Sequence, residues 1–215
     1  MIWYVIPARK GSKGLPNKNR LLFDFTASTI KNVHHDVIVT TNDEYIIDKA
    51  QEYEFNVRRR PDELAQDTTS IKAVMFDVFW WYKLKADDIV VMLYLTYPQR
   101  KWLDITKGLE YFYSYEAKSM LCRKEWQGVH PCLAMFQMYN NKGKQLFYHN
   151  YYRRQDYPKV FEISHFIAIF KVGELDKLNY QLYNQDTIFM PIRSDVIDID
   201  TIEDFKKYEQ CDERT

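Results

Sequence analysis

The residues best suited to chemistry lie in a basic segment near the start of the chain, Ile6 to Asn19, which reads IPARKGSKGLPNKN. It combines two glycines with four cations, Arg9, Lys10, Lys13 and Lys18. Glycines let backbone N–H groups come close to a ligand, and a dense set of cations offsets the charge of phosphates. The spacing matches neither the P-loop nor GxGxxG. We therefore interpret the segment as a triphosphate-binding loop of another kind, with a solvated basic turn as the alternative.

Two carboxylates in the last part of the chain, Asp198 and Asp200, form a second candidate site. On a strand over Val196–Asp200 both would point the same way. Carboxylates on one face repel each other unless a cation lies between them. Mg²⁺ bound by one or two carboxylates, phosphate oxygens and water meets that need, whereas a polar strand edge is the alternative. Asp204 follows Thr201 in a pattern that resembles a capping box, so we assign it a structural role at a helix start.

The pattern of apolar residues along the chain predicts an α/β fold. Apolar runs predict buried strands, and apolar residues at i, i+3 and i+4 predict helices. Their alternation over the first half predicts a doubly wound, mostly parallel sheet. In such sheets the loop after the first strand is where nucleotides bind. The predicted strands are Ile2–Ile6, Asp36–Thr41 and Asp88–Tyr94, and the predicted helices are Asp43–Tyr53, Ile71–Tyr82 after a cap at Thr69 or Ser70, and Trp102–Ser114.

Other segments carry weaker patterns. Only a short helix over Ala27–Val33 is predicted between the basic segment and the second strand. Arg58–Asp62 is predicted to be a loop, because Pro61 disfavours helix before it. In the second half, a predicted strand over Cys132–Tyr139 ends at the turn Asn140–Gly143. The remaining predictions are strands over Ser119–Glu125, Phe161–Phe170, Thr187–Pro191 and Val196–Asp200, and a closing helix over Ile202–Gln210.

Length and composition limit the classes of function. A chain of 215 residues fits one domain with a proper core. Its 30 basic and 30 acidic residues cancel, so no nucleic-acid partner is predicted. No apolar stretch is long enough to predict a membrane span. Three cysteines without CxxC spacing, Cys122, Cys132 and Cys211, predict reduced thiols in a cytoplasmic protein.

The order of several motifs carries a family resemblance. The opening segment, RRPDELAQDTTS over Arg59–Ser70, and DVIDID over Asp195–Asp200 followed by TIEDF resemble the signatures of the CMP-sugar synthetases. These enzymes are the cytidylyltransferases that activate sialic acid and related nonulosonic acids. His130-Pro131 and Arg153–Asp156 match weaker features of the family at plausible spacing. The similarity spans nearly the whole chain.

The resemblance implies a Rossmann-like nucleotidyltransferase that transfers CMP from CTP to the anomeric hydroxyl of a sugar acid and releases pyrophosphate. It also implies a Mg²⁺ cofactor and a homodimer, with a small β-rich segment at about residues 130–157 for dimerisation or as a sugar lid. Arg9 and Lys13 would be catalytic. Nucleotide binding would fall to Arg9, Ser12, Lys13, Lys18, Asn19, Arg60, Thr69 and Ser70, sugar binding to Tyr94, Arg154, Gln155 and His165, and metal binding to Asp198 and Asp200.

Departures from the family pattern concentrate in the sugar half. Tyr94 stands where the family has a glutamine, and Ser164-His165 stands where it has Asn-Gly. The segment between Asn19 and Asp36 is shorter than usual, which predicts a truncated first helix. We therefore expect an altered sugar specificity. Transfer to another sugar acid such as Kdo, and a non-catalytic nucleotide- or glycan-binding descendant, are the alternative functions.

Overall fold

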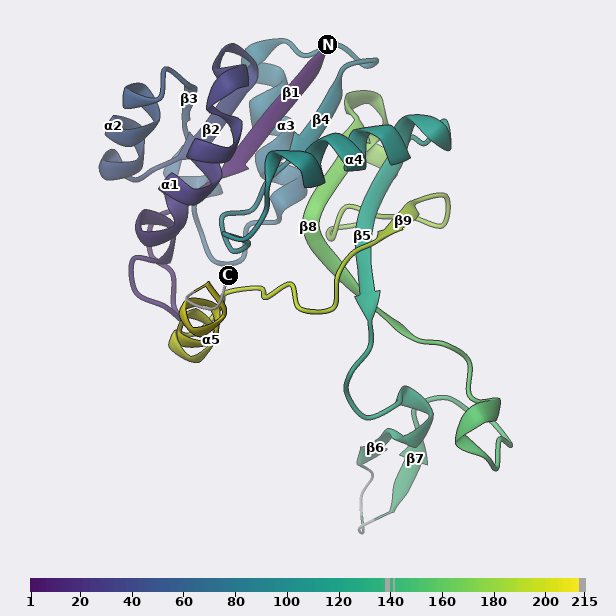
Figure 1. The fold of residues 1–215 in the computed structure, drawn as a ribbon. Coiled ribbons are helices and arrows are strands. Elements are labelled where there is room, and N and C mark those ends of the chain that lie inside the picture. Colours follow the sequence, from purple (N-terminus) through teal and green to yellow (C-terminus); the bar gives the residue numbers. More distant parts are fainter. Residues whose placement is uncertain (138–139, 141, 213–215) are drawn as a thin grey trace.

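A seven-stranded sheet forms the centre of the protein in the computed structural model, which describes residues 1–137, 140 and 142–212 (Figure 1). The strands are β1 (Ile2–Pro7), β2 (Val37–Thr41), β3 (Asn56–Arg59), β4 (Ile89–Met92), β5 (Ser119–Glu125), β8 (Phe161–Lys171) and β9 (Ile188–Pro191). Their order across the sheet is β3-β2-β1-β4-β8-β5-β9. Neighbouring strands are parallel except at β8, which is antiparallel to β4 and to β5. The predicted mostly parallel α/β fold is confirmed.

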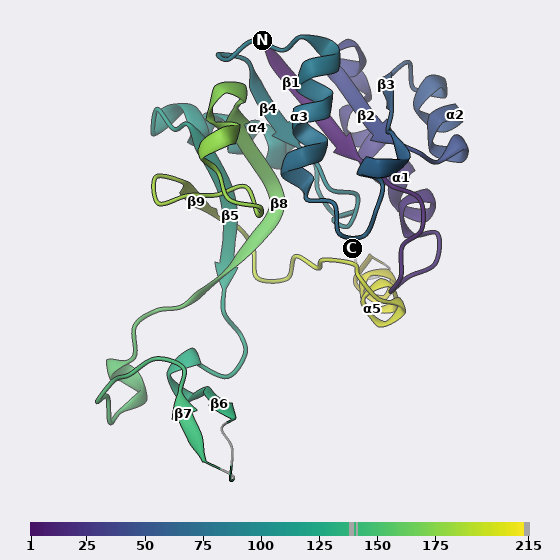
Figure 2. The ribbon, with the colours of Figure 1, turned by 180° about the vertical axis from the view of Figure 1, so that it is seen from behind.

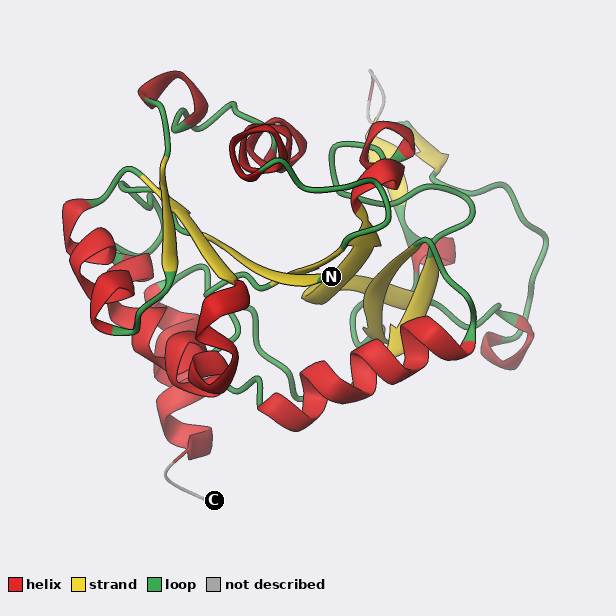
Figure 3. Ribbon diagram, turned by 90° about the horizontal axis from the view of Figure 1, so that it is seen from above, coloured by secondary structure: helices red, strands yellow, loops and turns green. Residues whose placement is uncertain are grey.

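Helices cover both faces of this sheet, as the view from above shows (Figure 3). The alternating residues of each strand face opposite cores: Tyr4 and Ile6 of β1 pack in one, and Val5 packs in the other. Helices α1, α2 and α4 bury apolar residues in the first core, and α3 packs in the second. The helices are α1 (Lys18–Ile30), α2 (Glu44–Glu52), α3 (Ile71–Tyr82), α4 (Trp102–Ser114) and α5 (Ile202–Asp212), with 3₁₀ segments η1 (Lys31–Asp36), η2 (Asp62–Leu64) and η6 (Val172–Lys177).

The strand order contains a switch point beside β1. After β1 the chain adds β2 and then β3 on one side, and it returns to place β4 on the other side. The connections that leave the carboxyl ends of β1 and β4 therefore diverge and leave a crevice between them. The basic segment follows β1 directly, so the fold places it at this crevice.

The prediction of only a short helix over Ala27–Val33 between the basic segment and the second strand is wrong. Helix α1 has 13 residues and begins at Lys18, well before the expected stretch Ala27–Val33. The buried residues Leu22, Phe23 and Thr26, with Ala27 and Ile30, recur on one face of the helix. Tertiary burial of this face stabilises a helix whose residues have only moderate intrinsic propensity.

The predicted loop over Arg58–Asp62 is partly wrong, because β3 continues to Arg59. This strand lies at the edge of the sheet, where charged side chains are tolerated. Arg58 makes two hydrogen bonds to the carboxylate of Asp77 on α3, at 2.9 and 2.7 Å, and its guanidinium lies 3.9 Å from the ring centre of Trp81. No strand was predicted here because a run of three arginines is not typical of a buried strand.

Residues 192–201 form no strand, in contrast to the prediction for Val196–Asp200. Val196 and Ile199 are nevertheless buried, so the apolar residues that suggested a strand anchor an irregular segment. The amide of Ile199 donates to the carbonyl of Thr96 at 2.9 Å. Helix α5 follows, and the capping box at Thr201 and Asp204 is confirmed by reciprocal hydrogen bonds of 3.0 and 3.2 Å.

An arm, defined here as residues 126–160, extends away from the sheet between β5 and β8 (Figures 1 and 2). A 3.2 Å hydrogen bond from the amide of Trp126 to the carbonyl of Val160 closes its base. The predicted strand Cys132–Tyr139 is shorter here, because a 3₁₀ turn precedes it and Met138 and Tyr139 lie outside the described residues, as does Asn141 of the predicted turn. The arm contains η3 (Pro131–Leu133), β6 (Met135–Gln137), its antiparallel partner β7 (Gly143–Gln145), and η5 (Arg154–Asp156).

Across the described part of the chain, no helix has the length and apolar character needed to cross a membrane.

Candidate active site

A cavity of about 470 Å³ opens at the switch point and is lined by residues from opposite ends of the sequence. Its walls come from the basic segment after β1, from residues 60–74, from the loop after β4, from β8, and from the irregular segment 192–201. Ten of the predicted site residues line it: Arg9, Ser12, Lys18, Asn19, Arg60, Thr69, Tyr94, His165, Asp198 and Asp200.

The basic segment is fixed to its surroundings by hydrogen bonds of its backbone. The side chain of Asn19 donates to the carbonyl of Arg9 at 2.8 Å, and the amide of Lys10 donates to the side chain of Asn42 at 2.8 Å. Gly11 has a φ of 83°, which is the left-handed region that favours glycine. Asn19 therefore shapes the loop as well as lining the cavity.

Gly14 joins the opening segment to the carboxylate segment. A Cβ atom at this position would lie 2.4 Å from the backbone oxygen of Asp200, so only glycine allows these two segments of the chain to approach so closely. Next to this contact, Nζ of Lys18 lies 2.6 Å from Oδ1 of Asp200. The two motifs that the sequence singled out separately are thus parts of one site.

Asp67 holds the two cations that were predicted to be catalytic. Its carboxylate lies 2.7 Å from Nη2 of Arg9 and also forms an ion pair with Lys13. The hydrogen bond from Lys13, together with the charge of Arg9, lowers the pKa of Asp67 below its ordinary value. Lys13 lies beside the cavity through this pair, although its side chain is exposed. A triphosphate that bound Arg9 and Lys13 would compete with Asp67 for both.

Arg60 supplies a buried positive charge to the cavity wall. It is 5% exposed, and its guanidinium donates to the carbonyl and the hydroxyl of Thr40 at 2.9 and 3.3 Å. Burial, and to a lesser extent the charge of Arg9, lowers the pKa of Arg60 to about 10. Both hydrogen bonds go to neutral oxygens, so neither offsets the charge. An anionic or strongly polar ligand would therefore be favourable beside it.

Asp198 accepts a hydrogen bond from a residue that sequence reasoning missed. The hydroxyl of Tyr97 donates to Oδ2 of Asp198 at 2.7 Å. Tyr97 is 3% exposed, and its burial together with the charge of Asp198 raises its pKa, so the hydroxyl remains protonated and donates. Tyr97 comes from the loop after β4, which borders the same crevice.

Tyr94 and His165 form an aromatic wall on the side of β8. Their ring centres lie 5.7 Å apart in an edge-to-face arrangement. Nε2 of His165 lies 2.9 Å from the carbonyl of Gln181 and must be its donor. In a neutral ring Nδ1 is then an acceptor. This pair can contact a ring substrate and accept one hydrogen bond from it.

The two aspartates fit a magnesium site that a ligand completes. Asp198 and Asp200 line one cavity and supply only hard oxygen donors. Among the described residues no group of three or more His, Cys, Asp or Glu side chains could hold a metal by itself. Mg²⁺ commonly uses one or two carboxylates together with phosphate oxygens and water.

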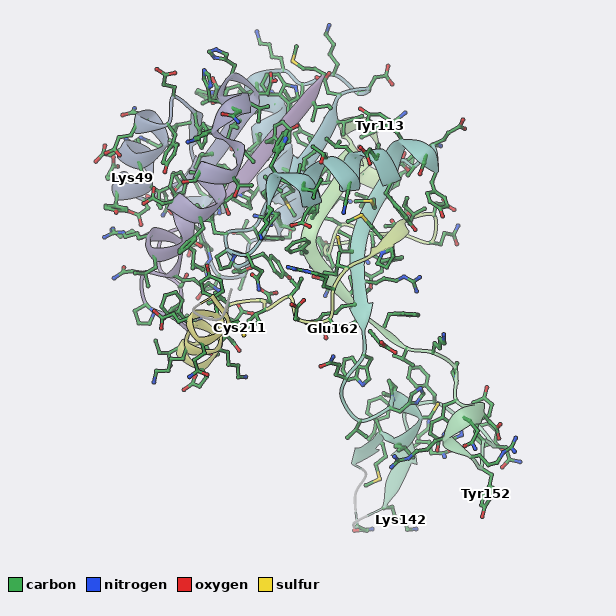
Figure 4. All side chains as sticks on the ribbon, in the orientation of Figure 1. Lys49, Tyr113, Lys142, Tyr152, Glu162 and Cys211 are labelled. Atoms are coloured by element: carbon green, nitrogen blue, oxygen red, sulfur yellow. The ribbon has the colours of Figure 1, made fainter. Side chains whose placement is uncertain are left out.

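Besides Lys13, three predicted residues do not line the cavity. Ser70 caps α3, where its hydroxyl accepts from the amide of Ala73 at 3.2 Å, as the sequence also indicated. Arg154 and Gln155 are exposed in the arm. Figure 4 shows the arm extending from near Glu162 at its base to Lys142 and Tyr152 at its far end, away from the body that contains the cavity. One chain does not bring these two residues to the site.

The comparisons with known proteins agree with this geometry. Residues 3–99 match a family model described as cytidylyltransferase. An N-acylneuraminate cytidylyltransferase of Streptococcus agalactiae is 26% identical over 222 positions, which cover 94% of this chain and 51% of that protein. The chain therefore spans about half the length of that relative. A pseudaminic acid cytidylyltransferase of Campylobacter jejuni is 26% identical over 94% of this chain and 92% of its own length.

Solved structures give the class of fold. A CMP:2-keto-3-deoxy-manno-octonic acid synthetase structure complexed with CTP has a TM-score of 0.65 at 15% identity, and it covers 99% of this chain and 98% of that one. A 4-diphosphocytidyl-2C-methyl-D-erythritol synthase of Anaerococcus prevotii has a TM-score of 0.63 at 16% identity, over 98% of each chain. The fold is that of the nucleotidyltransferases. Within that class, the resemblance to the cytidylyltransferases of nonulosonic acids is confirmed by the relatives that the sequence matches.

Proposed function

We propose that the protein is a cytidylyltransferase that couples CTP to a nonulosonic acid. The observation that carries the proposal is the cavity at the switch point, where the basic loop, Arg60 and the pair Asp198 and Asp200 meet. Relatives of similar sequence include enzymes named for N-acylneuraminate and for pseudaminic acid. Pocket walls rich in positive charge suit the triphosphate, and the aromatic wall suits a sugar ring.

The reaction needs positioning and charge stabilisation more than covalent chemistry by the protein. The anomeric oxygen of the sugar acid would form a bond to the α-phosphorus of CTP while the bond to the β-phosphate oxygen breaks. The products are the CMP-sugar, pyrophosphate and the proton of the attacking hydroxyl. Arg9, Lys13 and Lys18 would bind phosphate oxygens, and Ser12 and Asn19 would hold the loop and the nucleotide. Arg60 and Thr69 would contact the cytosine and ribose.

Asp198 and Asp200 would hold Mg²⁺, which supplies neutralisation of phosphate charge when bound. The ammonium of Lys18 forms an ion pair with Asp200 in this structure. With Asp200 as a ligand of the ion, the ammonium of Lys18 would be available to bind phosphate oxygens. Asp200→Asn should abolish Mg²⁺-dependent turnover and leave the circular dichroism spectrum unchanged. Undiminished turnover in this variant would remove the metal assignment.

The arm supports a second proposal, that two copies of the chain share their sugar sites. It exposes many large apolar side chains far from the sheet, and Arg154 and Gln155 lie among them without reaching the cavity of their own chain. A second copy would both cover these side chains and receive Arg154 near its aromatic wall. The exposed residues of the arm include Met135, Phe136, Phe147, Tyr148, Tyr151 and Tyr152.

The sequence relatives favour a nonulosonic acid, but the substitutions at the aromatic wall suggest that its contacts differ from the family pattern. Cys122 and Cys132 are buried thiols, which agrees with a protein that acts in the reducing cytoplasm. Kdo is an alternative substrate. A binding-only descendant is an alternative function, although a retained pair of carboxylates beside three cations favours catalysis.

The deciding experiment is pyrophosphate release from CTP and Mg²⁺ with sialic, legionaminic, pseudaminic and Kdo acids in turn. Release with one nonulosonic acid supports the proposal and identifies the substrate, whereas release with Kdo alone supports the alternative. If no acid gives pyrophosphate release while CTP still binds in calorimetry, the result favours a binding-only descendant. The absence of both turnover and CTP binding would overturn the assignment of the basic loop.

A further inference from the structure

The segment that carries Asp198 receives little support from its backbone. Over residues 192–201 the described chain forms no strand or helix. The amide of Ile192 donates to the carbonyl of Arg123, and that of Ile199 donates to the carbonyl of Thr96, each at 2.9 Å. These bonds fix where the segment lies, but they leave the Asp198 side chain free to rotate about its own bonds. The orientation of its carboxylate must come from a side-chain contact.

Tyr97 supplies that contact at the end of a directed chain of hydrogen bonds. The amide of Phe166 donates to the hydroxyl oxygen of Ser164 at 3.2 Å, and this hydroxyl donates to the oxygen of Tyr97 at 3.4 Å. Tyr97 in turn donates to Oδ2 of Asp198 at 2.7 Å. An ionised carboxylate only accepts, so the direction of the chain is fixed. The chain therefore runs from β8 of the sheet to the irregular segment.

The ring of Tyr97 is itself held rigidly. It lies edge to face on Phe166, with ring centres 5.7 Å apart. The carbonyl of Phe166 accepts a 2.6 Å hydrogen bond from the buried Arg100, whose guanidinium also donates to the carbonyl of Tyr94 at 2.7 Å. The loop after β4 and strand β8 are thus tied together around Tyr97. A hydroxyl on so fixed a ring can set the angle of a carboxylate.

We propose that Tyr97 is a positioning residue for the metal ion, because its hydroxyl holds Oδ2 of Asp198 and leaves Oδ1 for the ion. The inference rests on the proposed function, in which Asp198 and Asp200 share that ion. Hydrogen-bond partners behind a metal ligand typically change metal affinity by roughly 10- to 100-fold when they are removed. A buried tyrosine hydroxyl also needs a partner simply to avoid an unpaired polar group. That structural role alone would change stability and not metal affinity.

The test measures Mn²⁺ affinity by the loss of the free-ion signal in electron paramagnetic resonance. The protein is saturated with α,β-methylene-CTP, which cannot be turned over at the α–β bond, and the analogue alone gives the baseline. Tyr97→Phe keeps the ring and removes the hydroxyl. Tyr113→Phe, which removes an exposed tyrosine hydroxyl from α4, is the matched control (Figure 4). Affinity for the analogue without metal and the thermal midpoint are measured for each variant.

We expect Tyr97→Phe to weaken Mn²⁺ binding about tenfold, with metal-free analogue affinity close to that of the wild type and of Tyr113→Phe. Ser164→Ala, one step back along the chain, should weaken it less. Wild-type Mn²⁺ affinity in Tyr97→Phe would overturn the inference, as would an equal loss of analogue affinity without metal. If the wild-type protein adds nothing to the analogue's own Mn²⁺ affinity, the metal assignment of the proposed function fails, and the role of Tyr97 fails with it.

Discussion

The cavity and the arm both contain predicted site residues, but these residues differ in whether they have charged partners within the chain. In the cavity two of the cations already have charged partners within the chain, as the pairs Arg9–Asp67 and Lys18–Asp200 show. In the arm, Arg154 is exposed beside aromatic side chains such as Tyr152, which is 94% exposed. The ends of parallel strands assemble a site within one chain, because the sheet fixes where each loop begins. The contacts that hold the arm lie within the arm itself. Its residues can therefore reach a sugar site only if a second copy of the chain packs against the arm.

The arm is nevertheless ordered locally. Nε2 of His149 lies 2.7 Å from the carbonyl of Cys132, and Nε2 of His130 lies 2.9 Å from the carbonyl of Pro158. The rings of His149 and Tyr151 stack with centres 5.2 Å apart. These contacts stabilise the shape of the arm without attaching it to the sheet. The two regions therefore differ in where the partners of their site residues lie. Substitutions of site residues in the cavity and in the arm can test this difference.

The largest effect should come from the cavity. Arg9→Ala should lower kcat/KM roughly 10³-fold, because a guanidinium that binds the transferring phosphate stabilises both the bound triphosphate and the transition state. CTP affinity and kcat should therefore fall together in steady-state kinetics. Lys10→Ala removes an exposed cation from the same loop, outside the cavity lining, and should retain most activity. A change confined to the KM of the sugar acid would place Arg9 elsewhere.

A smaller and more selective effect should come from the arm. Arg154→Ala should raise the KM of the sugar acid roughly 10- to 100-fold, as expected when a charged hydrogen bond of about 1.5–3 kcal/mol is lost. The KM of CTP should change less than twofold. Arg153→Ala is the matched control, because that neighbouring guanidinium already pairs with Asp156 at 3.0 and 2.8 Å. Equal effects on both substrates would contradict the assignment of Arg154 to the sugar acid.

The same variants test whether two copies share a site. If Arg154 serves the partner's cavity, a mixture of inactive Arg9→Ala and impaired Arg154→Ala chains should recover activity after exchange, because one site of each mixed dimer is intact. Sedimentation should show a dimer for each variant. A monomer with full activity, or a mixture that recovers nothing, would contradict the shared site and make the arm a surface hairpin.

Sequence reasoning found most of the cavity and missed the residues that act through distant contacts. The basic segment and the aspartate pair were recognisable because their residue types and spacing are local. Asp67 is recognisable only as part of the motif Arg59–Ser70, and no pattern singles out Tyr97, since their partners at residues 9 and 198 lie far away along the chain. Edge strand β3 was not predicted because its residues are charged. Charged side chains are tolerated at the edge of a sheet, so they do not prevent a strand there. Local pattern predicts a residue's chemistry better than it predicts its partner.

A modest effect should follow when the internal competitor in the cavity is removed. Asp67→Asn frees Arg9 and Lys13, so CTP should bind up to about fivefold more tightly, the equivalent of losing an exposed ion pair worth up to about 1 kcal/mol. Calorimetry without metal measures this directly. Glu63→Gln removes the same charge from an exposed position four residues away, in η2, and should leave the affinity unchanged. Weaker binding in Asp67→Asn would mean that the carboxylate organises the loop more than it competes.

The smallest effect concerns Ser70, which was predicted to bind the nucleotide and which caps α3 at the border of the site. Its hydroxyl already accepts from the amide of Ala73, and Thr69, not Ser70, lines the cavity. Ser70→Ala should therefore lower the free energy of unfolding by about 1 kcal/mol, the usual worth of an N-cap, and change the KM of CTP less than twofold. Thr69→Val should instead raise the KM of CTP and change the free energy of unfolding little. Urea denaturation and steady-state kinetics on the two variants separate the roles, because a cap acts on the helix whereas a ligand contact acts only when CTP is bound. A large KM change in Ser70→Ala with unaltered stability would instead make the Ser70 hydroxyl a nucleotide contact, beside the residues of the first turn of α3 that already line the cavity.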